Sequence, residues 1–93
     1  MKKVRLLVSG RVQGVGFRYS IARLASQIGD INGRVWNNKD GTVEILAQST
    51  NHRKLDDFII AVRKTPFRFA KVTYVDVTTD NSEEFQDFQI LRS

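Results

Sequence analysis

A glycine-rich segment, residues 10–18, constrains the fold of this 93-residue chain more than any other feature. Before it, Val4, Leu6 and Val8 alternate with other residues, which is the pattern of a half-buried strand. After it, apolar residues recur at helical spacing as far as Gly29, a residue typical of a helix end. The chain is therefore predicted to begin with a strand, a tight glycine loop and a helix.

The remaining patterns complete a mixed fold. A strand is predicted at 33–37, a hairpin turn at 38–41, a strand at 42–48 and, after an N-cap at Thr50 or Asn51, a helix with an apolar stripe. Pro66 breaks that helix, and strands at 70–79 and 85–91 follow, joined by an acidic loop. This order predicts an α+β, ferredoxin-like two-layer sandwich over residues 1–93, taken as a single domain. It is β-α-β-β-α-β with a short fifth strand, and two helices cover one face of an antiparallel sheet.

Composition excludes several kinds of chemistry. The chain has no cysteine, which rules out disulfides, thiolate metal sites and cysteine nucleophiles, and His52 is its sole histidine. We therefore expect no metal and no cofactor, and we interpret His52 as a solvated residue at a helix start. No segment approaches the roughly 20 apolar residues of a membrane span, so a cytoplasmic, unprocessed protein without membrane contact is expected.

Charge is distributed unevenly along the chain. The net charge is +5, and the first 25 residues carry basic side chains but no acidic ones. A positive region of this kind favours an anionic partner, either a small phosphate compound or a nucleic acid. Charge alone does not choose between these two partners.

The glycine loop has the composition of an anion-binding site. Gly14 and Gly16 tolerate backbone angles that other residues avoid, and they let a ligand approach closely. The N–H groups of residues 13–18 are expected near the positive end of the following helix, where phosphate binds readily. Arg18 adds a planar charged group that can hold two phosphate oxygens. The loop lacks the Gly-Lys-Ser/Thr of nucleotide-binding P-loops. A plain strand-to-helix connection with a solvated arginine remains the alternative interpretation.

Asn37 is the second candidate for a functional residue. It ends the second predicted strand, whose end is expected to approach the glycine loop. An asparagine offers both an acceptor oxygen and donor hydrogens, so it can orient a water molecule without titrating. Asn38, Lys39 and Asp40 are interpreted as residues that only form the hairpin turn.

Two motifs together resemble those of the acylphosphatases. They are Gly10-x-Val12-Gln13-Gly14-Val15-x-Phe17-Arg18 and Gly33-x-Val35-x-Asn37-x-x-Asp40-Gly41-x-Val43-Glu44, and the resemblance extends over the whole chain. It implies hydrolysis of the carboxyl–phosphate anhydride of a small acyl phosphate to a carboxylate and inorganic phosphate, without a metal. A monomer is expected, although the sequence carries no signal for the oligomeric state. It also implies that Arg18 binds the phosphate and Asn37 holds the attacking water. Phosphate-binding N–H groups are then expected from Gln13, Gly14, Val15, Gly16 and Phe17.

The chain departs from the family pattern beside Asn37. Arg34 and Trp36 stand as if exchanged, and both are expected on one sheet face, away from the loop. This exchange is expected to alter the surface, and with it substrate preference, rather than the chemistry.

A ferredoxin-like module that binds an anionic metabolite or RNA without cleaving it remains the alternative function. Phe67 and Phe69 could stack on bases, but the central strands lack the aromatic motif of RNA-recognition domains, so nucleic acid is not the expected partner. Both phenylalanines are instead expected to fill the end of the core.

Overall fold

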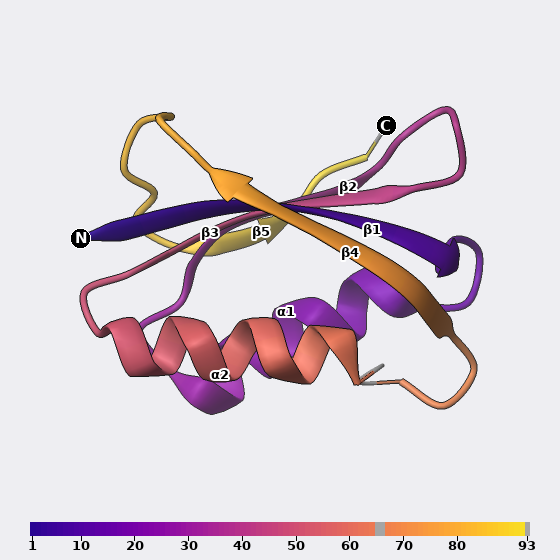
Figure 1. Ribbon diagram of the computed structural model, residues 1–93, viewed down its shortest axis with the longest axis horizontal. Coiled ribbons are helices and arrows are strands. Elements are labelled where there is room, and N and C mark those ends of the chain that lie inside the picture. Colours follow the sequence, from indigo (N-terminus) through magenta and orange to yellow (C-terminus); the bar gives the residue numbers. More distant parts are fainter. Residues whose placement is uncertain (65–66, 93) are drawn as a thin grey trace.

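Two helices lie side by side beneath one sheet in the computed structural model, which describes residues 1–64 and 67–92 (Figure 1). The order of elements is the predicted one, and Pro66 lies outside the described residues. The elements are β1 (Lys2–Arg11), α1 (Phe17–Ile28), β2 (Asn32–Asn37), β3 (Val43–Ser49), α2 (His52–Arg63), β4 (Lys71–Thr79) and β5 (Phe88–Ile90). The α+β, ferredoxin-like two-layer prediction is confirmed.

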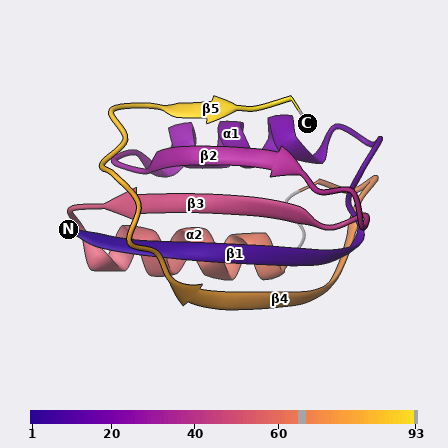
Figure 2. The ribbon, with the colours of Figure 1, turned by 90° about the horizontal axis from the view of Figure 1, so that it is seen from above.

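The sheet is mixed, not antiparallel throughout as predicted. Its strand order is β4-β1-β3-β2-β5, and the first four strands pair antiparallel. β5 pairs parallel with β2, because the chain leaving β4 at one edge crosses over the sheet and enters the opposite edge in the direction of β2 (Figure 2).

This topology brings three parts of the chain to one end of the molecule. β1 and β2 run in the same direction with β3 between them, so both strands end at the edge where α1 begins (Figure 2). Asn37 therefore lies near the glycine loop even though β2 and β1 are not neighbouring strands.

The core fills the space between the helices and one sheet face. Phe17, Ile21 and Ala25 of α1 are at most 1% exposed, and they pack with strand residues such as Val35 and Ile45. The helical spacing of these three residues predicted this buried face correctly. Because Phe17 is buried, the start of α1 is fixed directly after the glycine loop.

The helix ends follow the predicted signals, and of the two candidate N-caps of α2, Thr50 and Asn51, the structure shows Asn51. Asn51 caps α2, where its Oδ1 accepts hydrogen bonds from the N–H groups of Arg53 at 3.0 Å and Lys54 at 3.2 Å. The hydroxyl of Thr50 instead donates to the Asp30 carboxylate. Gly29 ends α1 with φ 81°, and its N–H donates to the Ala25 carbonyl.

The last strand is shorter than predicted. Side chains of β2 and β3, not a strand ladder, hold the residues before it. The side chain of Gln48 is 1% exposed, and it donates to the Glu83 carbonyl and accepts from the Phe85 N–H, both at 2.7 Å. The Arg34 guanidinium lies 4.5 Å from the centre of the Phe85 ring and forms a 2.9 Å ion pair with Asp87.

The prediction for the two phenylalanines after α2 is only half right. Phe67 packs against the core, whereas Phe69 is 58% exposed. The Phe69 ring stacks on the Arg68 guanidinium at 4.8 Å and meets Phe67 edge-on at 5.3 Å between ring centres. Phe69 therefore belongs to the surface because its contacts are local and lie outside the core.

We expect Gly33→Ala to destabilise the fold strongly. A Cβ at Gly33 in β2 would lie 1.7 Å from the Leu46 carbonyl oxygen, so the β2–β3 pair would have to separate. The expected loss in the free energy of unfolding is about 3 kcal/mol or more, measured by urea denaturation. Gly41→Ala is the matched control. A Cβ there meets no atom within 4 Å, so the only cost comes from the positive φ of this residue, and the free energy of unfolding should fall by about 1 kcal/mol. Equal losses in the two variants would contradict the close-packing argument.

Candidate active site

The glycine loop presents unpaired backbone donors at the start of α1. Gly14 and Gly16 have φ of 73° and 82°, the left-handed conformation that glycine adopts without strain. The first helical hydrogen bond runs from the Ser20 N–H to the Gly16 carbonyl, so the preceding amides have no intrahelical acceptor. None of the N–H groups of residues 13–18 donates to another described residue. The loop therefore presents several unpaired donors at the positive end of a helix dipole.

Arg18 is positioned by the far end of the chain. Its Nη1 donates to the Leu91 carbonyl at 2.9 Å, and the Leu91 N–H donates in turn to the Val35 carbonyl at 2.8 Å. Arg18 forms no ion pair with a described residue. The guanidinium is thus tied to β2 through backbone groups, and its charge remains available for an anion.

Asn37 lies on the helix-covered face of the sheet, in alternation with the core residue Val35. Its Oδ1 is buried and accepts no hydrogen bond within residues 1–64 and 67–92. Buried polar atoms nearly always have a partner, in protein or in ordered water, so an unpaired one needs an explanation. A polar ligand or a bound water is the usual kind of partner in such a place.

The side chain of Gln13 connects the glycine loop to the turn that follows Asn37. Its Nε2 donates to the Asn38 carbonyl at 2.7 Å and to the Thr42 carbonyl at 2.9 Å. Sequence reasoning assigned Gln13 a backbone role only and missed this contact. Both acceptors are backbone carbonyls, which leave no signal in a sequence, and the same holds for the Leu91 carbonyl beside Arg18.

The turn residues have the structural role that the sequence predicted. Asn38 donates through Nδ2 to Thr42 Oγ1 at 3.0 Å and to Glu44 at 3.1 Å. The Asp40 carboxylate accepts from the hydroxyl and the N–H of Thr42, and these bonds hold its pKa below the usual value. These contacts make the end of β2 a rigid support for Asn37.

Arg34 and Trp36 lie on the sheet face opposite the helices. The Trp36 Nε1 donates to Asn38 Oδ1 at 3.0 Å, and Arg34 is paired with Asp87. Within the described part of the chain, neither side chain forms a hydrogen bond or an ion pair with the glycine loop, as expected from their shared face. Trp36 therefore supports the turn that follows Asn37.

No group of three or more metal-ligating side chains occurs within the described residues. No helix there has the length and hydrophobicity needed to span a bilayer. His52 is the exposed first residue of α2, as the sequence predicted.

We expect Gln13→Ala to loosen the loop. Two hydrogen bonds to partly buried carbonyls are lost, so the free energy of unfolding in urea should fall by about 1–3 kcal/mol. Gln13→Glu should cost more, because a carboxylate cannot donate and would face two carbonyl oxygens. A Gln13→Glu protein as stable as the wild type would contradict this role for the side chain.

Comparison with known proteins decides the family. The sequence model of the acylphosphatase family matches residues 4–90. The chain belongs to the acylphosphatase family. An acylphosphatase from Lactococcus lactis subsp. lactis (strain IL1403) is 51% identical over 96 residues, which cover 97% of this chain and 98% of that protein. The crystal structure of an acylphosphatase from Bacillus subtilis matches with a TM-score of 0.88 at 41% identity, covering 98% of this chain and 99% of that one.

A more distant acylphosphatase structure agrees with this assignment. The protein from Coxiella burnetii matches with a TM-score of 0.86 at 28% identity, covering 97% of this chain and 92% of that one. The chain is therefore an acylphosphatase, an enzyme that hydrolyses small acyl phosphates.

Proposed function

We propose that this acylphosphatase cleaves its substrate by direct attack of a water held by Asn37 on a phosphate held by Arg18 and the N–H groups of residues 13–18. The observation that carries the proposal is the buried, unpaired Oδ1 of Asn37, on the same end of the fold as the unpaired loop donors. One group can bind a water and the other a phosphate, which are the two reactants of a hydrolysis.

The proposed reaction balances without a further reagent. The water oxygen forms a bond to phosphorus while the bond from phosphorus to the acyl oxygen breaks, and the carboxylate leaves with the bonding electrons. No histidine or cysteine is available at the site, so a phosphate oxygen of the substrate accepts the proton of the water. The products are a carboxylate and inorganic phosphate.

Catalysis in this scheme comes from positioning and electrostatics. Charge spreads over the phosphoryl oxygens in the transition state, where fixed N–H donors and a guanidinium stabilise it. The site supplies both kinds of group before the substrate arrives, since Arg18 is anchored to Leu91 and the loop is anchored through Gln13.

Hydrolysis of benzoyl phosphate, followed by its ultraviolet absorbance, tests the proposal. We expect rapid turnover by the wild type, no measurable turnover in Arg18→Ala and a strongly lowered kcat in Asn37→Ala. Turnover close to the wild-type rate in either variant would remove that residue from the mechanism. A folded wild type that binds inorganic phosphate but cleaves nothing would support the alternative of a phosphate-binding module.

We expect the activity to be insensitive to chelators. In the proposed mechanism the positive charge comes from Arg18, the loop amides and the helix dipole, so no step requires a divalent cation. The rate of benzoyl phosphate hydrolysis should be unchanged after dialysis against EDTA. A loss of rate that Mg²⁺ or Zn²⁺ restores would overturn the metal-free mechanism.

A further inference from the structure

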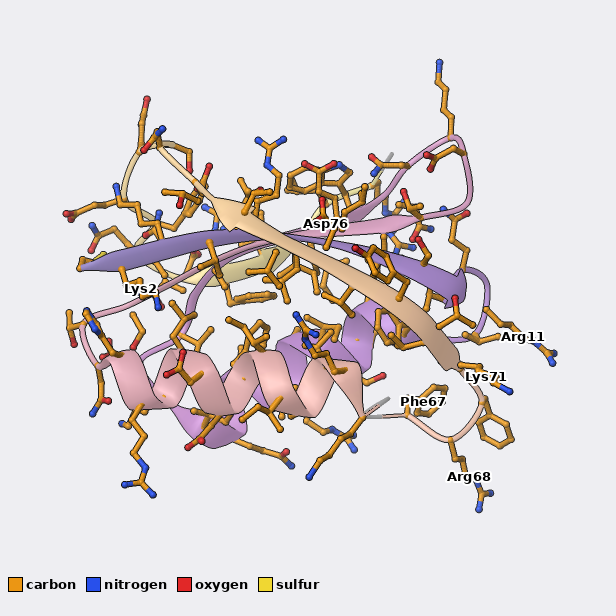
Figure 3. The ribbon with its side chains drawn as sticks, in the orientation of Figure 1. Lys2, Arg11, Phe67, Arg68, Lys71 and Asp76 are labelled. Atoms are coloured by element: carbon orange, nitrogen blue, oxygen red, sulfur yellow. The ribbon has the colours of Figure 1, made fainter. Side chains whose placement is uncertain are left out.

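A surface hollow of about 240 Å³ adjoins the glycine loop on the α2 side of α1. Its lining residues are Gly16, Tyr19, Ser20, Arg23 and Phe67. A Cβ at Gly16 would lie 3.7 Å from the Phe67 ring, so the hollow begins at the loop itself. Figure 3 shows Phe67 at this end of the molecule, near Arg11 and Lys71. The volume suits a small organic group rather than a large ligand.

We propose that this hollow is the acyl-group subsite of the enzyme, and that Arg23 selects acyl phosphates whose acyl group carries a second negative charge. The inference rests on the proposed function, because it takes the phosphate to be bound at the glycine loop. The substrate class is an acyl phosphate with a flat or apolar group next to the anhydride and an anionic group beyond it.

The direction of the reaction supports this placement. In an in-line displacement, the leaving group departs on the side opposite the attacking water. In the proposed function Asn37 of β2 holds the water, so the acyl group leaves on the side of the phosphate that faces away from Asn37. The hollow lies on the flank of α1 that faces α2, next to Gly16, and none of its lining residues comes from β2, so it is open to an acyl group that departs from Asn37.

The lining residues match this class of ligand. Tyr19 is 72% exposed and Phe67 is half-buried, so two aromatic faces border the hollow. Arg23 is exposed and forms no ion pair with a described residue. A cation beside aromatic surface suits a ligand that is apolar at one point and anionic at another.

The spacing along α1 sets the distance between the two anionic groups. Arg23 lies seven residues after Gly16, which corresponds to about 10 Å along a helix axis, and the two residues share one face. Helical side chains lean toward the N-terminus, so the guanidinium lies closer to the loop than its Cα does. The second anion is therefore expected a few atoms beyond the acyl carbonyl.

Longer acyl groups have a path beyond this first hollow. A second hollow of about 360 Å³ shares Ser20, Arg23 and Phe67 with the first and extends between the helices to Lys64. Lys64 is exposed and adds a second cation to this path. The positive charge therefore continues along the groove instead of ending at the loop.

The test compares benzoyl phosphate with 4-carboxybenzoyl phosphate, which differ only in a second carboxylate across the ring. The measured quantity is the ratio of kcat/KM for the carboxylated substrate to that for the plain one. We expect this ratio to fall about tenfold in Arg23→Gln, the effect of one charged hydrogen bond. A larger fall is expected in Arg23→Glu. The electronic effect of the added carboxylate is the same for every variant, so it cancels from this comparison.

Arg53→Gln is the matched control, since it removes one exposed cation at the start of α2, the end of the molecule opposite the glycine loop. Its ratio should equal that of the wild type. Equal ratios in the wild type, Arg23→Gln and Arg23→Glu would refute the subsite and leave the proposed function standing. A wild type that hydrolyses neither substrate would instead refute the proposed function.

Discussion

Arg18→Ala is expected to abolish measurable hydrolysis of acyl phosphates. Removal of one fixed donor at a site of developing charge typically lowers the rate by roughly 10²–10³. The guanidinium of Arg18 offers two donors and a full positive charge to the same phosphate, so the loss of kcat/KM should be at least as large. Stopped assays with benzoyl phosphate at high enzyme concentration measure the residual kcat/KM of the variant.

Two further variants separate the geometry of Arg18 from its charge. Arg18→Lys keeps the charge but loses the planar pair of donors and the bond to the Leu91 carbonyl, so it should recover only a small part of the activity. Arg53→Ala removes an exposed arginine far from the loop and should retain wild-type kinetics. If Arg18→Lys were fully active, the bidentate contact would not be needed and the charge alone would account for catalysis.

The fold could be predicted from the sequence because its signals are local. Alternation in β1 and helical spacing in α1 each come from residues that face one core, and the turn residues after Asn37 carry their own signal. The direction of β5 was predicted wrongly, since it depends on a crossing whose anchors, Gln48 and Arg34, lie far from β5 in the sequence. Phe69 was wrongly assigned to the core for a similar reason, because hydrophobicity does not distinguish a core ring from one stacked on a neighbouring arginine.

The residues of the candidate site could be predicted from the sequence, but the contacts that position them could not. Side chains that repeat a family motif, Arg18 and Asn37, could be named from the sequence together with the residues of the loop. The contacts that hold them could not, because Arg18 and Gln13 donate to backbone carbonyls contributed by segments far away in the chain. A carbonyl group is present at every residue, so only the folded chain shows which one is used.

Asn37→Ala is expected to lower kcat by roughly 10²–10³ while leaving phosphate binding nearly unchanged. The Oδ1 of Asn37 accepts no bond within the described residues, so its removal leaves no protein donor unpaired and should affect the fold little. The variant loses the group that orients the attacking water, and this loss lowers the rate of the chemical step without lowering the affinity for phosphate. Competitive inhibition by inorganic phosphate should therefore keep its wild-type constant.

Asn32→Ala is the matched control for the expected result that kcat falls while phosphate binding is unchanged. Asn32 begins the strand that Asn37 ends, so the two variants make the same chemical change at opposite ends of β2. Asn32→Ala should retain the wild-type kcat. Weaker phosphate inhibition in Asn37→Ala with an unchanged kcat would mean that Asn37 binds the phosphate and that another group directs the water. A parallel loss of kcat and of phosphate binding would mean that Asn37 instead shapes the loop as a whole.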